Sequence, residues 1–189
     1  LMLGANPLAS NGSIWTVPDV RQRLKDLKSR GGKLVVVDPR RTETAELASE
    51  HLFIRPGTDA AFLLAMIHVL FRDDLVAPGP LATFTDGLDE VAGAVSRLSP
   101  DWASALTGIA AGDIERIAHE LAQAEAGICY GRMGVSTQAD GALCQWAIPE
   151  LNVATGHLDK PGGSLFTRPA MDQVVNTNPG GFGRFASRR

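Results

Sequence analysis

The chain has 189 residues, enough for one domain with a substantial core, and 44% of them are hydrophobic and 21% charged. Its formal net charge of −3 gives no reason to expect nucleic acid as a partner. Two cysteines, Cys129 and Cys144, are too few and too far apart for a disulfide framework or a cysteine-rich metal site. No apolar run reaches the roughly 18 residues of a membrane span and no signal peptide is seen, so we expect a cytoplasmic rather than a periplasmic location.

The first elements predict a βαβ unit. Residues 1–3 are typical of the end of a buried strand, and a loop of turn-forming residues follows them. A helix is predicted over residues 16–30, because Thr16–Asp19 supplies a cap, a proline for the first turn and an acid in capping-box position. Leu34–Val37 is a continuous apolar run, the pattern of a parallel strand covered on both faces.

The alternation of helix and strand patterns continues along the chain. Helices are predicted over residues 42–49, 59–72, 87–97, 111–124 and 142–154, with Pro149 kinking or restarting the last one, and strands over residues 51–55 and 127–130. This order predicts an α/β fold with a parallel, Rossmann-like sheet flanked by helices. We expect this domain to occupy residues 1–165 and an irregular tail, 166–189, to lead to a further domain.

In open parallel sheets, ligands bind beyond the carboxyl ends of the strands, so the loops after the predicted strands deserve inspection. The first of these loops offers Gly4, Asn6 and Ser10. Glycine lets a ligand approach the backbone closely, and small amides and hydroxyls donate to ligand oxygens. The loop is not the GxGxxG fingerprint of dinucleotide sites, and a simple left-handed turn is the alternative interpretation.

The second loop begins with an acid at the exit of a hydrophobic strand. Asp38 in this position can accept hydrogen bonds from the two hydroxyls of a ribose, while Arg40 and Arg41 can meet phosphate or stack on a base. The alternative is that Asp38 caps the short helix that follows it.

The third loop, Gly57–Asp59, stands at a predicted helix N-terminus. The Asp59 carboxylate can accept both N–H donors on the edge of a guanine, and ordinary helix capping is the alternative. The fourth loop, Gly131–Gly134, again combines glycine with a basic residue. No nucleophile–base pair and no paired carboxylates are recognisable, so the four loops together favour a nucleotide-bearing ligand over a catalytic centre.

Six motifs, taken in order, resemble the molybdopterin oxidoreductase family, which includes dimethyl sulfoxide reductase, periplasmic nitrate reductase and molybdenum-dependent formate dehydrogenase. The motifs are GANP, VVVDPRRTETA, RPGTDAAFLLAM, TGI, YGRMGVSTQ and LNVATGHLDKPGG. They cover about residues 1–163, nearly the whole chain, and the spacing of VDPRRTETA and RPGTDAA is highly specific.

The resemblance implies a cofactor-binding domain. Enzymes of this family carry molybdenum or tungsten held by two molybdopterin guanine dinucleotides, and this chain resembles most of the α/β domain that grips one of them. The residues that the resemblance assigns to cofactor binding are Gly4, Asn6 and Ser10 on the pyrophosphate and pterin side, Asp38 and Arg40 at the nucleotide, Gly57, Thr58 and Asp59 at the guanine edge, and Met133 with Thr137 or Gln138 near the pterin. Gly156 and residues 160–163 match a further turn near the cofactor.

The resemblance also implies that the chemistry lies outside this chain. The family's metal-ligating residue, its N-terminal cysteine cluster for an iron–sulfur centre and its C-terminal barrel domain have no counterpart here. We therefore expect no catalytic or metal-ligating residue in this chain, and an inactive fragment of an enzyme that performs two-electron redox chemistry or oxo transfer. Its partners would be the remaining domains of that enzyme, and its exposed apolar surfaces would favour self-association. The alternatives are a stand-alone nucleotide-binding module or a structural subunit domain without a ligand.

Overall fold

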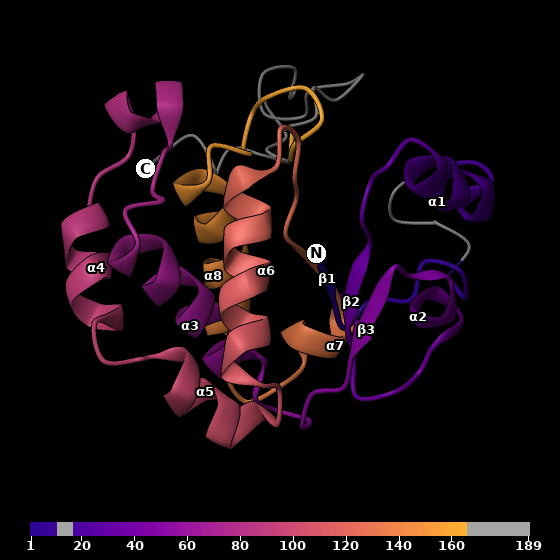
Figure 1. The fold of residues 1–189 in the computed structure, drawn as a ribbon, viewed down its shortest axis with the longest axis horizontal. Helices are drawn as coiled ribbons and strands as arrows, with labels where there is room; N and C mark the ends of the chain where they lie inside the picture. Colours follow the sequence, from indigo (N-terminus) through magenta and orange to yellow (C-terminus); the bar gives the residue numbers. More distant parts are fainter. Residues whose placement is uncertain (11–16, 166–189) are drawn as a thin grey trace, which may run out of the picture.

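A computed structural model describes residues 1–10 and 17–165, which form an α/β fold around a parallel sheet (Figure 1). The sheet has the strand order β3-β2-β1-β4, with β1 at Met2–Leu3, β2 at Val35–Val37, β3 at Glu50–Leu52 and β4 at Tyr130–Gly131. The helices are α1 (Val20–Ser29), α2 (Glu43–Leu47), α3 (Asp59–Arg72), α4 (Leu88–Val95), α5 (Pro100–Thr107), α6 (Ala111–Gln123), α7 (Met133–Ser136) and α8 (Gly141–Ala154), with a 3-10 turn at Gly79–Thr83. The predicted fold class is confirmed, while the predicted tail lies outside the described residues.

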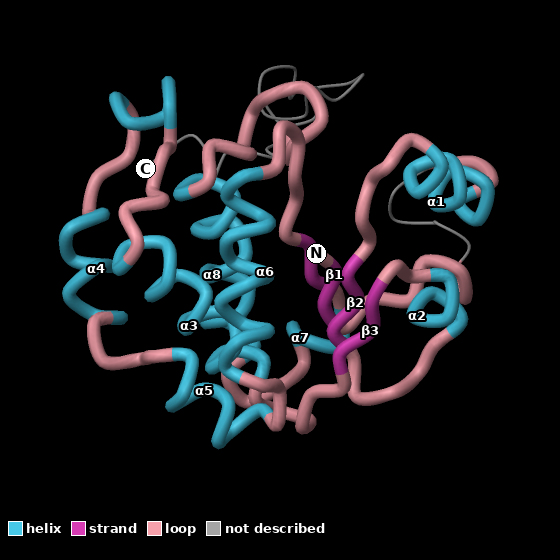
Figure 2. The backbone as a smooth tube through the Cα atoms, in the orientation of Figure 1, coloured by secondary structure: helices cyan, strands magenta, loops and turns pink. Residues whose placement is uncertain are grey.

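Helices cover both faces of the sheet. Figure 1 shows α1 and α2 on one side of the strands and α3, α6 and α8 gathered on the other, and Figure 2 shows the short strands between these two layers. Side chains alternate between the faces, as in any strand. Leu3 and Val37 join the core cluster that contains α3, α6 and α8, whereas Met2 and Val36 pack with α1 and α2.

Helix α3 is the centre of the larger layer. Its sequence is apolar on every side, which is typical of a helix surrounded by protein. It packs against α4, α5, α6 and α8, and Phe62, Leu63, Met66 and Ile67 are fully buried. This helix begins at Asp59, so its burial carries that acid into the interior.

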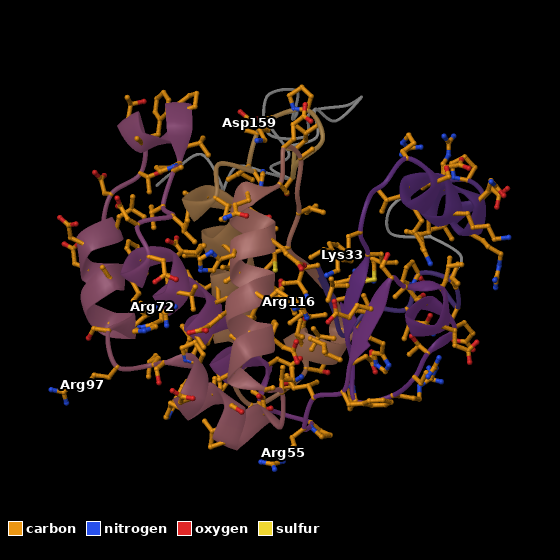
Figure 3. All side chains as sticks on the ribbon, viewed as in Figure 1. Lys33, Arg55, Arg72, Arg97, Arg116 and Asp159 are labelled. Carbon is orange, nitrogen blue, oxygen red and sulfur yellow. The ribbon has the colours of Figure 1, made fainter. Side chains whose placement is uncertain are left out.

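Ion pairs join α6 to the amino ends of two strands. Lys33 contacts Glu50 at 2.9 Å and Glu120 at 2.7 Å, and Arg116 binds both of these carboxylates. Burial alone would raise the pKa of Glu50, but hydrogen bonds from Arg116 and Lys33 outweigh it and hold the pKa below its usual range. Figure 3 shows Arg116 and Lys33 between α6 and the strands, at the end of the sheet opposite the carboxyl edge.

The start of α1 differs from the prediction. The helix begins at Val20, with Asp19 as its N-cap in the left-handed conformation, and the Asp19 carboxylate accepts a hydrogen bond from the Gln22 N–H at 3.2 Å. Pro18 therefore lies before the helix, and Asp19 caps it directly instead of completing a capping box. The predicted cap Thr16 lies outside the described residues.

One strand ends earlier than predicted, and two helices, α5 and α7, were not predicted. The strand predicted over residues 51–55 ends at Leu52, because Arg55 leaves the sheet and donates its N–H to the Thr107 carbonyl at 2.9 Å. Helix α5 was not predicted, although Ser99 caps it and Pro100 opens it. The region predicted as a loop over residues 131–141 contains the short helix α7, and α8 runs through Pro149 without restarting.

The predicted strand over residues 127–130 is observed as β4 at Tyr130–Gly131, and buried Asn152 bonds to the backbone just before it. Its Oδ1 accepts from the Cys129 N–H at 2.8 Å, and its Nδ2 donates to the carbonyls of Cys129 at 2.8 Å and Ile148 at 3.0 Å. The side-chain amide thus replaces a neighbouring strand as the partner of the Cys129 backbone.

We predict that Asn152→Leu lowers the free energy of unfolding by about 2–4 kcal/mol, because it leaves the buried N–H and carbonyl of Cys129 without partners. Urea unfolding followed by circular dichroism measures this loss. Gln145→Leu is the matched control, since its amide lies exposed on the same helix and its loss should change stability by no more than about 0.5 kcal/mol. Equal effects of the two substitutions would contradict the backbone-bridging role of Asn152.

Candidate functional site

The candidate site lies at the carboxyl edge of the sheet, at the point where the topology reverses. Strand β1 pairs with β2 on one side and with β4 on the other. After β1 the chain continues to α1 on one face of the sheet, and after β4 it continues to α8 on the other. This is the position where open parallel sheets bind ligands. Residues from the four loops after β1, β2, β3 and β4 meet around it.

Gly4 and Gly134 bring the first and fourth loops into backbone contact. The Gly134 N–H donates to the Gly4 carbonyl at 3.0 Å. A Cβ on Gly134 would lie 2.6 Å from the Gly4 Cα, and a Cβ on Gly4 would lie 2.8 Å from the Gly134 backbone. Gly4 also has φ of +53°, which L side chains rarely adopt. The glycine predicted at the first loop is therefore required by a close backbone approach as well as by its turn.

Asp38 organises its own loop. Its N–H extends the pairing with β3 by donating to the Leu52 carbonyl at 3.2 Å, and its Oδ1 accepts from the Arg40 N–H at 2.8 Å. The alternative that Asp38 caps the next helix is wrong, because Thr42 is the N-cap of α2 and accepts from the Ala45 N–H at 3.1 Å. Asp38 is half-buried. The half-buried carboxylate is thus held at the strand exit by its own loop.

Asp59 is the most deeply buried acid of the site, with 3% of its surface exposed. Its Oδ2 accepts a hydrogen bond from the side-chain amide of Gln138 at 2.7 Å, across 79 positions of sequence. Burial raises the pKa of Asp59, the negative charge of Asp38 adds to this, and the Gln138 hydrogen bond offsets part of it. Asp59 is the first residue of α3, and Thr58 is the N-cap, although its hydroxyl donates to the Arg55 carbonyl at 2.7 Å and makes no capping bond.

Among the described residues, the side chains of Asn6, Ser10 and Arg40 make no hydrogen bond with Asp59 or Gln138. Asn6 uses both ends of its amide to hold the first loop against α2, since Nδ2 donates to Glu43 and Oδ1 accepts from Thr44, both at 2.7 Å. Ser10 and Arg40 are exposed. Ligand contacts of Asn6, Ser10 and Arg40 stay predictions. The structure shows in addition that Asn6 holds the loop after β1 against α2.

The remaining predicted residues lie close in sequence to Asp59 or to Gly134. Gly57 has φ of +82° with open space around it, and it forms the turn before α3. Met133 begins α7 and is 59% exposed, and the exposed Thr137 donates its hydroxyl to the Met133 carbonyl at 2.7 Å. The family motif had suggested Thr137 or Gln138 as a pterin contact, but the structure joins Gln138 to Asp59.

Sequence reasoning did not single out Gly134. The available signal was its position, three residues beyond the end of a strand in a loop that again combines glycine with arginine. The two cysteines are buried and free, as predicted, and burial raises the pKa of Cys129 to about 12 and that of Cys144 to about 11. Both thiols therefore stay protonated near neutral pH, which is typical of inert core cysteines.

The described residues offer neither a metal site nor a membrane helix. Within residues 1–10 and 17–165 there is no group of three histidine, cysteine or acidic side chains that could hold a metal ion. No helix in the same ranges is long and apolar enough to cross a membrane. What these residues do assemble is a candidate binding edge with two neighbouring acids, Asp38 and Asp59, and two closely packed glycines.

Comparison with known proteins agrees with this architecture. The family model described as molybdopterin oxidoreductase matches residues 1–179. Formate dehydrogenase H of Escherichia coli is 31% identical over 160 residues, which are 85% of this chain and 22% of that protein. The thiosulfate reductase molybdopterin-containing subunit PhsA of Salmonella typhimurium is 33% identical, over 82% of this chain and 21% of that protein.

A solved structure shows the same fold. Acetylene hydratase from Pelobacter acetylenicus superposes with a TM-score of 0.70 and 29% sequence identity, over 82% of this chain and 21% of that chain. This chain thus spans about a fifth of the length of the relatives that it matches. On the strength of the match over residues 1–179, the chain belongs to the molybdopterin oxidoreductase family.

Proposed function

We propose that this chain binds the guanine nucleotide end of a molybdopterin guanine dinucleotide, as the cofactor-binding part of a larger molybdenum or tungsten oxidoreductase. The observation that carries the proposal is Asp59, a carboxylate that is 3% exposed and lies near Asp38 at the carboxyl edge of the sheet. Among the described residues Asp59 has no ion-pair partner. A buried acid with a raised pKa and no cation is costly for folding, and such groups gather at functional sites.

A carboxylate at this position suits guanine. The N1–H and the 2-amino group of guanine are adjacent donors, and the two oxygens of a carboxylate accept from both. Adenine presents a ring nitrogen acceptor in the corresponding place, which a carboxylate repels. Asp59 would therefore select the base, while Asp38, at the end of the neighbouring strand, would accept from the ribose hydroxyls.

The rest of the edge fits the same ligand. Gly4 and Gly134 place no side chain where the loops after β1 and β4 meet, so a pyrophosphate can approach the main chain there. The Oε1 atom of Gln138 is buried without a hydrogen-bond partner, so the polar groups around Asp59 are incompletely satisfied without a ligand. The bound group would supply two-electron redox chemistry, and this chain would hold and orient its nucleotide.

The relatives are about four times as long as this chain. We propose that exposed apolar side chains on α7 and α8 contact the rest of the parent enzyme. Met133, Leu143 and Trp146 are 59%, 39% and 43% exposed. Leu143 and Trp146 are three positions apart on one helix and so share a face. In the isolated chain this face would favour self-association.

Isothermal titration calorimetry with GDP and ADP tests the proposed function. We expect GDP to bind at least about tenfold more tightly than ADP, because the guanine-edge hydrogen bonds discriminate between bases by roughly 1–3 kcal/mol. Asp38→Ala should weaken GDP binding without changing the preference for guanine. Equal binding of GDP and ADP, or binding of neither, would show that this chain has no guanine site of its own.

A further inference from the structure

The contact between Gln138 and Asp59 raises a question about access. The Asp59 carboxylate is buried, and the Gln138 amide lies against its Oδ2 at 2.7 Å. The same Nε2 also donates to the Gly134 carbonyl at 2.5 Å. While this amide remains in place it occupies one acceptor position of Oδ2, so a guanine edge that needs both carboxylate oxygens has to compete with it.

We propose that Gln138 is a latch, whose side-chain amide occupies the Asp59 carboxylate in the empty site and must swing away before a guanine base can bind. The inference rests on the proposed function and adds a regulatory step to the same site. The amide group resembles the exocyclic amino group of guanine, since both present an N–H donor attached to a planar carbon. In the absence of nucleotide, the latched Gln138 therefore gives the buried Asp59 carboxylate a hydrogen-bond donor.

The latched state is incompletely satisfied, which makes it easy to open. Both donor contacts of Gln138 are made, but its Oε1 is buried with no hydrogen-bond partner among the described residues. A buried unpaired acceptor carries a desolvation cost, and that cost is relieved when the side chain turns toward water or a ligand. The Gln138–Asp59 contact thus gives the acid a partner but leaves one acceptor of Gln138 unpaired.

The surroundings of Gln138 allow this movement. It lies between the end of α7 at Ser136 and the start of α8 at Gly141, and its neighbours Thr137, Ala139 and Asp140 are exposed. The Gln138 backbone is tied to α8 through its carbonyl, which accepts from the Gly141 N–H at 3.0 Å. The side chain can therefore change its rotamer while the backbone and the core keep their positions.

The experiment measures GDP affinity of the Gln138→Ala chain by calorimetry. If the latch competes with the base, removing it should tighten GDP binding by about tenfold, because the open site no longer has to be created by breaking a hydrogen bond to a charged group. Gln145→Ala is the matched control, since that exposed glutamine donates to the nearby Ser136 hydroxyl at 2.8 Å and makes no contact with Asp59. Its GDP affinity should equal that of the unmodified chain.

A second variant and a measurement without ligand distinguish failure of the latch from failure of the proposed guanine site. Gln138→Ser also cannot reach Asp59 and should behave like the alanine variant. By carbon NMR, the pKa of Asp59 should rise further in both variants, because they lose a hydrogen bond that lowers it. GDP binding that is unchanged or weaker in the Gln138 variants would overturn the latch and leave the proposed function standing. Absence of GDP binding in every chain would overturn the proposed function, and the latch with it.

Discussion

Replacing Gly134 with alanine is expected to lower the free energy of unfolding by about 2–3 kcal/mol. The new Cβ would lie 2.6 Å from the Gly4 Cα and 2.8 Å from the Gly4 carbonyl oxygen. Both atoms belong to the main chain, so no side-chain rotation can relieve the clash. The loops after β1 and β4 would have to separate, which would weaken the 3.0 Å hydrogen bond between the Gly134 N–H and the Gly4 carbonyl.

The control for this experiment is Gly93→Ala. Gly93 is exposed within α4, and a Cβ built on it would have no neighbour within 4 Å. Alanine there should stabilise the chain by roughly 0.5–1 kcal/mol, because glycine loses more conformational freedom in a helix. Chemical unfolding of the two variants beside the unmodified chain gives both numbers. Similar values at the two positions would mean that the contact between the loops after β1 and β4 tolerates a side chain.

Sequence patterns predicted those parts of the fold that are encoded over a few consecutive residues. The apolar run Leu34–Val37 is buried at every position, and it could be recognised because a strand covered on both faces has no polar side. Helix α3 was equally clear, since an apolar helix of this length has to be surrounded by protein. Both predictions depend only on local pattern and on the need to bury apolar surface.

Contacts between distant residues were not predictable in the same way. The Gln138–Asp59 hydrogen bond spans 79 positions, and the Asn152–Cys129 bridge spans 23. Nothing in the pattern around Gln138 indicates Asp59 as its partner, and the predicted contact of Gln138 with a pterin stays a prediction. Helix α5 is a different case, because Ser99 and Pro100 are a readable start signal for a helix of only eight residues.

The sequence predicted at which edge of the sheet the candidate site lies, but not the contacts of its side chains. Parallel strands all end at the same edge, so Gly4, Asp38 and the loop after β4 had to lie close together once the topology was assumed. The partners of each side chain depend on loop conformations that sequence periodicity does not describe. Asn6 illustrates this, because its amide turns toward Glu43 and Thr44 in α2.

Asp59→Asn is expected to have opposite effects on binding and on stability. GDP affinity should fall by about 10–100-fold, since an amide offers one acceptor where the carboxylate offers two and the charge-assisted hydrogen bonds are lost. At pH 7 the free energy of unfolding should increase, because the variant no longer buries an ionised group whose pKa is raised by burial and by the charge of Asp38. A residue retained only for stability would not behave in this way.

The pH dependence distinguishes this cause from a general packing effect. The ordinary pKa of Asp59 is 3.8 and its folded pKa is higher, so the folded acid binds a proton more readily than the unfolded one. Below pH 3.8 the acid is protonated in both states and carries no ionisation cost. As pH rises toward the folded pKa, the unfolded state ionises first and the unmodified chain loses stability, and the loss is complete above the folded pKa. The advantage of the asparagine variant should therefore grow from about pH 4 upward and then level off.

Asp101→Asn provides the comparison for both measurements. Asp101 also lies in the first turn of a helix, α5, but it is exposed and distant in sequence from the site. Its replacement should leave GDP affinity unchanged and should slightly lower stability, because an exposed acid in the first turn interacts favourably with the helix dipole. If Asp59→Asn instead lost stability at pH 7 and kept its GDP affinity, the carboxylate would be a structural element of α3. A gain in stability with a loss of GDP binding is the combination that only a ligand-binding acid produces, since the fold bears the cost of a charge whose benefit arises when the nucleotide is present.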